Sequence, residues 1–177
     1  CPSRTAIGID VDGGFAELAR IPARCCWPAP PGLAPEQLLL TEPLAVVVRA
    51  AGRGAVRAGE TAAVLGAGTL GLLAVQVLKS RGARVLAVSR SDRRLALARE
   101  LGADAVHSLS GGPAAPVARR FSGREGVDLV VETAGTPEAV EEAVELARPG
   151  GRVVFTGLPH EPSRVHFFWV VRRELTM

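Results

Sequence analysis

One short segment has the residue types and the spacing to bind a phosphate-containing ligand. Residues 66–71 read Gly-Ala-Gly-Thr-Leu-Gly and fit the pattern G-x-G-x-x-G. An apolar run at Thr61–Leu65 precedes the motif and a helical pattern follows it, which is the context that this motif requires. The motif therefore predicts a dinucleotide-binding loop, and the alternative is a glycine-rich turn of the kind found in any α/β sheet.

Each residue of the motif has a physical role in such a loop. Gly66 permits the tight turn, Gly68 lets a pyrophosphate approach the backbone, and Gly71 lets the helix pack closely on the strand. The helix that opens at Thr69 and Leu70 presents free N–H groups and its dipole to the anion.

The residues after the next strand distinguish between two cofactors. NAD sites usually carry an acidic residue about 20 positions after the glycines, which bonds the ribose hydroxyls. Here that region reads Ser89 and Arg90, with Arg94 within one helical turn. A hydroxyl and a guanidinium can bind a 2′-phosphate that a carboxylate would repel. The sequence predicts NADP, with NAD as the alternative if these arginines are ordinary surface residues.

The elements that must position these residues alternate regularly from residue 61 onward. Strands are predicted at residues 61–65, 84–88, 105–107, 127–131 and 152–156, and helices at 70–81, 91–101, 117–121 and 137–147. Ser91 is expected to cap the second helix, and residues 149–151 to form a turn. This alternation indicates βαβ units in a doubly wound parallel sheet of the α/β, Rossmann class.

The first 45 residues differ from the rest, because they are rich in proline and glycine. Short strand-like pieces are predicted around residues 6–9 and 15–21. A short helix is expected to open at Pro35, where proline suits a first turn. A further helix is predicted over residues 42–51.

Composition excludes several classes of function. The chain has 177 residues, a net charge of +3 and no tyrosine, so these residues supply no tyrosine acid or base. The basic residues are scattered without interleaved aromatics, and we expect no nucleic-acid partner. No apolar run reaches the roughly 18 residues that span a bilayer, and no leader pattern is visible. We therefore expect no membrane partner and a cytoplasmic protein.

Further motifs occur in a consistent order along the chain. They are DGGFAEL at residues 12–18, Glu-Pro-Leu-Ala at 42–45, the glycine motif, VDLVVETAG at 127–135, PGGR at 149–152 and RRELT at 172–176. With these motifs the chain resembles the medium-chain dehydrogenase/reductase superfamily over essentially its whole length. The similarity is to the zinc-dependent alcohol and polyol dehydrogenases, which include threonine dehydrogenases.

The resemblance implies a fold and an activity. It implies a Rossmann domain at residues 46–177, truncated in its last strand, preceded at residues 1–45 by the C-terminal remnant of a β-rich, GroES-like catalytic domain. It implies hydride transfer between an alcohol or polyol carbon and the nicotinamide of NAD(P), with zinc as the Lewis acid in the longer parent protein. It also implies a homo-oligomer in full-length form.

The resemblance extends to particular residues. Thr133, Gly157 and Leu158 map to the loops that surround the nicotinamide. Cys1 matches the last cysteine of a structural-zinc lobe, and Glu42 matches a glutamate near the catalytic zinc. The Cys and His-Glu zinc ligands of such enzymes have no match here, so no catalytic residue is assigned and the chain alone is expected to be inactive.

Other interpretations remain open. A zinc-free quinone or enone reductase of the same superfamily is the closest alternative, and a nucleotide-sensing module without chemistry is another. A methyltransferase is disfavoured because no acidic residue follows the second strand. The acidic residues of the helix near position 140 (Glu138, Glu141, Glu142 and Glu145) are expected to form a solvated face.

Overall fold

The computed structural model describes residues 3–177. Contacts divide the chain into two compact units, Cys1–Leu38 and Leu39–Met177. The division falls at Leu38, a few residues before the predicted domain boundary at position 45.

The first unit contains little regular structure. It has a 3-10 helix, η1 (Ala23–Cys25), and a short helix, α1 (Pro35–Leu38), which confirms the helix expected at Pro35. The strands predicted around residues 6–9 and 15–21 are wrong, because the described residues of this unit form only an isolated bridge between Ile7 and Val11. A strand needs a neighbour for the N–H and C=O groups along its length, and the described residues of this unit supply only this one bridge.

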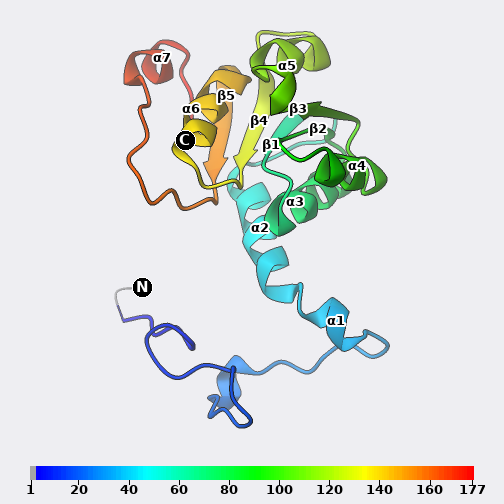
Figure 1. Cartoon of the computed structure of the whole chain (residues 1–177), viewed down its shortest axis with the longest axis vertical. Coiled ribbons are helices and arrows are strands. Elements are labelled where there is room, and N and C mark those ends of the chain that lie inside the picture. Colours follow the sequence, from blue (N-terminus) through cyan, green and yellow to red (C-terminus); the bar gives the residue numbers. More distant parts are fainter. Residues whose placement is uncertain (1–2) are drawn as a thin grey trace. The chain divides into compact units, whose positions relative to one another are not determined.

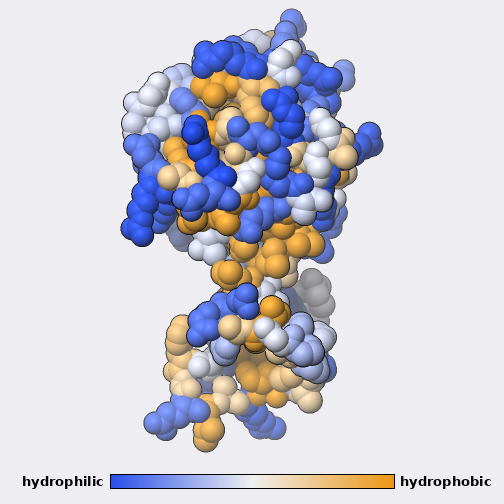
Figure 2. All heavy atoms as spheres, turned by 90° about the vertical axis from the view of Figure 1, so that its right-hand side faces the viewer, coloured by the Kyte–Doolittle hydropathy of each residue, from blue (hydrophilic) through white to orange (hydrophobic). Residues whose placement is uncertain are grey.

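Apolar side chains of the first unit remain at its surface. Phe15, Leu18 and Trp27 are exposed, and Figure 2 shows hydrophobic atoms on the outside of this part of the chain. A lone segment with so few buried contacts does not form a hydrophobic core of its own.

The second unit is a layered α/β fold (Figure 1). Its first half contains α2 (Thr41–Arg53), β1 (Thr61–Leu65), α3 (Thr69–Ser80), β2 (Arg84–Ser89), α4 (Asp92–Glu100) and β3 (Ala105–Ser108). Its second half contains η2 (Leu109–Gly111), α5 (Ala115–Ser122), β4 (Val127–Glu132), α6 (Pro137–Leu146), β5 (Ala147–Phe155) and α7 (Phe167–Arg172). The sheet is five-stranded and parallel in the order β3-β2-β1-β4-β5, which confirms the predicted Rossmann class.

The sheet is buried on both faces, and this explains the continuous apolar strands. In β1, Ala62 and Val64 pack in a cluster with residues of α2, α3 and α4, while Ala63 and Leu65 pack with residues of α5 and α6. Because successive side chains of a strand point to opposite faces, a strand covered on both sides needs an apolar residue at every position.

Local details differ from the sequence predictions. The predicted turn at residues 149–151 lies inside β5, because Ala147 already pairs with Val127 and the register then shifts before Leu129. Ser91 occupies the N-cap position of α4, but its side chain makes no capping hydrogen bond. Thr136 does cap α6, since its hydroxyl accepts a hydrogen bond from the N–H of Ala139.

The chain returns to the sheet after α7. Thr176 forms a parallel bridge with Arg152 of β5. The N–H of Val153 donates to the carbonyl of Thr176 at 2.8 Å, and the N–H of Thr176 donates to Gly151 at 3.0 Å. Thr176 therefore occupies the position beside β5 where a sixth strand of the order 3-2-1-4-5-6 begins.

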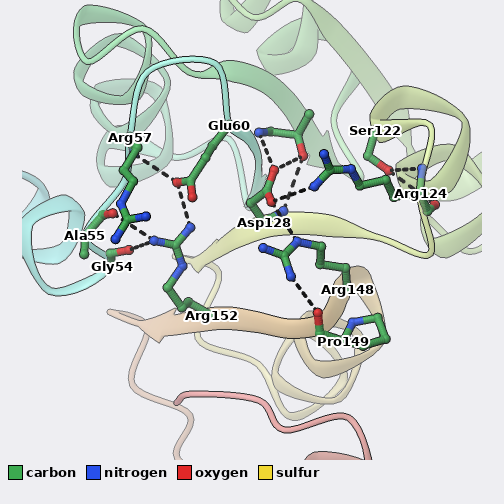
Figure 3. A network of polar contacts seen from close by, with 11 residues as sticks. Gly54, Ala55, Arg57, Glu60, Ser122, Arg124, Asp128, Arg148, Pro149 and Arg152 are labelled. Carbon is green, nitrogen blue, oxygen red and sulfur yellow. Dashed lines mark hydrogen bonds and ion pairs between the residues drawn. The ribbon is translucent and has the colours of Figure 1, made fainter.

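A buried polar network ties together the amino ends of the central strands (Figure 3). Asp128 accepts hydrogen bonds from the N–H and the hydroxyl of Thr61, both at 2.8 Å, and from Nε of Arg148 at 2.7 Å. Arg152 donates to the carbonyls of Gly54 and Ala55 and pairs with Glu60 at 2.7 Å. These contacts link β4 to β1 and β5, and link β5 to the segment between α2 and β1.

The charge of Asp128 stabilises the fold. Burial alone would raise the pKa of this carboxyl, but the hydrogen bonds from Thr61 and Arg148 outweigh burial and hold the pKa below its ordinary value of 3.8. A group whose pKa is depressed in the folded state stabilises the fold above its unfolded pKa. That stabilisation is lost as the pH falls through the folded pKa.

We expect Asp128→Asn to lower the free energy of unfolding at pH 7 by about 2 kcal/mol, because the charged partner of Arg148 and Thr61 is lost. Urea denaturation at a series of pH values measures this. The gap between the two proteins should narrow as the pH falls below about 4. Asp12→Asn, at an exposed position, is the control and should leave stability unchanged. A difference in the free energy of unfolding that stays constant down to pH 2 would contradict the stabilising role of the Asp128 charge.

Candidate cofactor-binding site

A cleft of about 650 Å³ lies at the carboxyl ends of β1, β2 and β4. In the sheet, β1 lies between β2 and β4. The chain adds strands on one side of β1 as far as β3 and then on the other side from β4, so the direction of strand order reverses at β1. In an open parallel sheet this point of reversal is where ligands bind. The lining residues come from the glycine loop (Leu65, Gly66, Ala67, Gly68), from the end of β2 and α4 (Val88, Ser89, Arg90, Ser91, Arg94), from Leu109, and from the β4–α6 segment (Thr133, Ala134, Thr136, Glu138, Ala139, Glu142).

The backbone surroundings of the three glycines in the loop differ, so a side chain would have a different effect at each position. Gly66 has a positive φ of 93°, and a Cβ there would lie 2.9 Å from the N atom of Ala134. A Cβ on Gly71 would lie 1.8 Å from the carbonyl oxygen of Gly66, so only glycine lets α3 begin this close to β1. Gly68 differs, because a Cβ there would meet no atom within 4 Å. The space beside Gly68 is open and faces the first turn of α3.

That first turn supplies hydrogen-bond donors. An α-helix leaves its first N–H groups without partners inside the helix, and in α3 these belong to Thr69, Leu70 and Gly71. The first intrahelical bond runs from the N–H of Leu72 to the carbonyl of Gly68. The open space beside Gly68 therefore adjoins the positive end of a helix of 12 residues, which suits a pyrophosphate.

Thr133 holds the glycine loop against the end of β4. Its hydroxyl donates toward the carbonyls of Leu65 and Gly66, at 2.9 and 3.0 Å, and its N–H donates to Leu65 at 2.9 Å. Sequence reasoning placed Thr133 near the nicotinamide by resemblance. In the structure it lines the cleft and positions the loop through these hydrogen bonds.

Two arginines and a serine line the cleft at the end of β2. Ser89 is buried and its hydroxyl accepts from the N–H of Ser91, while Arg90 and Arg94 are exposed. Neither arginine forms an ion pair with another residue in the described part of the chain. The two guanidinium groups are thus available to an anionic ligand.

Acidic residues of α6 also reach the cleft. The backbone N–H of Glu138, the Thr136 hydroxyl and the charge of Arg90 lower the pKa of Glu138. Glu142 accepts a hydrogen bond from the backbone N–H of Ala114 at 2.8 Å, and Glu141 accepts one from the backbone N–H of Arg164 at 2.7 Å. The prediction of a purely solvated acidic face is therefore wrong, because two of these side chains hold neighbouring segments.

The buried carboxylate of Glu132 organises the loops at the ends of β4 and β5. Its Oε1 atom accepts from the N–H groups of Ala134 and Gly135, at 2.6 and 2.8 Å. Its backbone carbonyl accepts from the N–H and the hydroxyl of Thr156 and from the N–H of Gly157. Sequence reasoning treated this glutamate only as part of a motif.

The structure brings together most of the predicted cofactor residues. Gly66, Gly68, Ser89, Arg90, Arg94 and Thr133 line the cleft, and Thr69, Leu70 and Gly71 form the first turn of α3 beside it. Gly157 and Leu158 do not line the cleft, and instead lie against Gly135.

Several lining residues were missed by the sequence analysis. Ala134 and Thr136 follow directly after β4, so the rule that ligands bind at the carboxyl ends of parallel strands could have identified them. No local pattern marks Leu109 or Glu142, because only the tertiary fold carries them to the cleft.

The described residues do not fit a zinc site. No three His, Cys, Asp or Glu side chains of residues 3–177 lie close enough together to hold a metal ion. Glu42 is exposed in the first turn of α2, and Cys1 lies outside the described residues. No helix among the described residues is long and apolar enough to cross a membrane.

The sheet order, the glycine loop and the cleft at the reversal point define a Rossmann domain of the dinucleotide-binding class. Residues 69–177 match the family described as zinc-binding dehydrogenase. The chain belongs to the zinc-binding dehydrogenase family, as the resemblance predicted.

Individual relatives agree with this assignment. The chain is 37% identical over 166 residues to L-threonine 3-dehydrogenase of Bacillus velezensis, an alignment that covers 93% of this chain and 48% of the relative. It is 34% identical to the starvation-sensing protein RspB of Escherichia coli K12, over 100% of this chain and 52% of the relative. The chain thus spans about half the length of the curated relatives it matches.

Two solved structures that share the fold contain a bound cofactor. The RspB alcohol dehydrogenase of E. coli CFT073, complexed with NADH, superposes with a TM-score of 0.91 at 34% identity, over 99% of this chain and 52% of that one. A zinc-binding dehydrogenase of Sinorhizobium meliloti bound to NADP has a TM-score of 0.90 at 36% identity, over 99% and 53% of the two chains.

We expect Gly71→Ala and Gly68→Ala to differ sharply in stability. The first places a Cβ against the Gly66 carbonyl and should lower the free energy of unfolding by about 3 kcal/mol or more. The second places a Cβ in open space and should cost less than about 1 kcal/mol. Thermal and urea denaturation of the two variants measure this, and equal destabilisation would contradict the separate roles of the two glycines.

Proposed function

We propose that this chain is the cofactor-binding part of a zinc-dependent dehydrogenase that transfers hydride between an alcohol or polyol carbon and a nicotinamide. The open space beside Gly68, at the amino end of α3 and the reversal point of the sheet, is the observation that carries the proposal. The bound nicotinamide supplies the hydride acceptor and donor. The residues of this chain bind the cofactor and orient it.

We assign each part of the cofactor to a part of the cleft. The pyrophosphate lies over Gly68 with the N–H groups of α3 as donors, and the adenosine ribose lies at the end of β2. The nicotinamide lies toward the segment after β4, where Thr133 lines the cleft. Substrate and zinc ligands, including any part played by Glu42 or Cys1, belong to the longer parent protein.

The chemistry at the end of β2 supports NADP over NAD. No carboxylate lies at the end of β2, where Ser89 is the last strand residue and Arg90 follows it. Arg90 and Arg94 line the same cleft and offer positive charge to a 2′-phosphate. The related structures hold NADH in one case and NADP in another, so the proposal rests on these residues.

Two further properties of the full-length protein belong to the proposal. The parallel bridge at Thr176 starts a sixth strand beside β5, and an edge strand of this kind suits pairing with a second copy in a homo-oligomer. We also propose that the protein acts in the cytoplasm.

Cofactor binding by the 177-residue chain tests the proposal directly. We expect calorimetric titration to show NADP bound about tenfold more tightly than NAD, because charge-assisted hydrogen bonds hold the 2′-phosphate. Arg90→Ala should weaken NADP binding by about tenfold and change NAD binding little. Gly68→Ala should weaken both, because its Cβ enters the space of the pyrophosphate.

Arg99→Ala is the matched control, since Arg99 lies on α4 but does not line the cleft. It should leave both dissociation constants unchanged. Binding of neither dinucleotide would overturn the proposed function, whereas NAD binding as tight as NADP would overturn only the cofactor preference.

We expect no alcohol-dependent formation of NADPH by this chain, even with added Zn²⁺, because its described residues bring no metal-ligand cluster together. Absorbance at the NADPH band, with threonine and simple alcohols as substrates, measures this. Turnover by the purified 177-residue chain would contradict the expectation.

A further inference from the structure

Two side chains of opposite charge line the cofactor cleft from different segments. Arg90 directly follows β2, and Glu138 lies in the first turn of α6, which follows β4. Because β2 and β4 flank β1 in the sheet, the segments that follow them lie on either side of the glycine loop. Both side chains are exposed. The cleft therefore presents a cation from one wall and a carboxylate from the other.

The charge of Arg90 acts on Glu138. The backbone N–H of Glu138, the hydroxyl of Thr136 and the charge of Arg90 together hold the pKa of this carboxyl below its ordinary value of 4.5, so the group is ionised at neutral pH. The ion pairs of the described chain include neither side chain, so the two groups attract each other without direct contact. Arg90 therefore has an anionic neighbour before any ligand enters the cleft.

The other acidic residue of the cleft is bound to a neighbouring segment. Glu142 accepts a hydrogen bond from the backbone N–H of Ala114 at 2.8 Å, which holds its carboxylate on the residue before α5. The hydrogen bonds of Glu138 are local, because they come from its own N–H and from Thr136, two residues earlier. Glu138 is thus the carboxylate of the cleft that holds no distant segment of the chain.

A 2′-phosphate changes the balance of charge in the cleft. NAD has a neutral hydroxyl where NADP has a phosphate monoester, which carries about two negative charges at pH 7. In the proposed arrangement the adenosine ribose lies at the end of β2, where Arg90 is the first residue after the strand. A phosphate there binds the guanidinium that Glu138 attracts and also enters the negative field of Glu138. Both effects oppose NADP and act little on the uncharged hydroxyl of NAD.

We propose that Glu138 competes with the 2′-phosphate for Arg90 and thereby limits the preference of the cleft for NADP. The proposal rests on the proposed function, since it needs a dinucleotide in this cleft. Glu138 is a specificity-determining residue, because its charge acts on the part of the cofactor that distinguishes NADP from NAD. It belongs to α6, whereas the local sequence pattern places the choice of cofactor at the end of β2.

The test compares the dissociation constants of NADP and NAD, measured by calorimetry on the 177-residue chain. In Glu138→Gln, NADP should bind about threefold more tightly and NAD binding should change little, because a water-screened repulsive charge is removed. Raising the salt concentration to about 0.5 M should reduce the difference between variant and wild type, because salt screens exposed charges. Glu138→Ala is a second neutral variant and should change the ratio of the two constants in the same direction.

A double variant tests the competition itself. In the Arg90→Ala background, Glu138→Gln should tighten NADP binding by a smaller factor than it does in the wild type, because the guanidinium for which the two anions compete is absent. The same factor in both backgrounds would show that Glu138 acts without Arg90, and would overturn the proposed competition.

Two controls separate the charge of Glu138 from its place in the helix. Glu138→Asp keeps a carboxylate in the first turn of α6, so it should keep the wild-type ratio of the two constants. Glu145→Gln removes an exposed charge of the same helix that does not line the cleft, and should leave both constants unchanged. An unchanged ratio in Glu138→Gln, or an equal change for both cofactors, would overturn the proposal. Binding of neither dinucleotide by the wild type would overturn the proposed function instead.

Discussion

The close approach of three chain segments at the carboxyl edge of the sheet is the constraint on which the rest of the structure depends. The segment after β4 contacts the glycine loop after β1 and also the segment after β5, and these contacts leave no room for side chains at Gly66, Gly71 and Gly157. Hydrogen bonds to the neighbouring backbone stabilise this arrangement. The hydroxyl of Thr133 donates to carbonyl groups, and the carboxyl group of Glu132 accepts from N–H groups. Three residues of the glycine loop, Gly66, Ala67 and Gly68, line the cleft, so backbone atoms form part of its wall.

Polar groups at the amino ends of the strands and at the carboxyl ends of the strands differ in whether they have partners within the chain. At the amino edge, Asp128 and Arg152 satisfy buried donors and acceptors with charged partners from neighbouring segments. At the carboxyl edge, the first N–H groups of α3 and the guanidinium groups of Arg90 and Arg94 form no hydrogen bond or ion pair within the described chain. One edge stabilises the fold by completing its hydrogen bonds, and the other edge leaves donors available to an anion.

The first unit shows how strongly local structure depends on partners. Its apolar pieces have a composition typical of strands, but Phe15 and Leu18 stay exposed and no strand forms among its described residues. The relatives are about twice as long as this chain. In contrast, the strands from residue 61 onward pair with one another. Most of their predicted ends lie within a few residues of the ends in the structure.

The sequence by itself determined the class of the fold and predicted the place where an anion would bind. Periodic apolar runs, the glycine spacing and the absence of an acid after β2 are local signals, because each depends on neighbours along the chain. The full length of β5 depends on its pairing with β4, and the cap at Thr136 depends on the local backbone geometry. Sequence patterns predict these two features less clearly.

Only the tertiary structure decided which distant side chains share the cleft and what surrounds them. Glu142 and Leu109 reach it because helices and strands far apart in sequence pack against each other. The burial of Glu132 and its unpartnered oxygen likewise appear only when the loops after β4 and β5 meet. Burial and close approach are properties of packing between segments, and no spacing within a single segment specifies them.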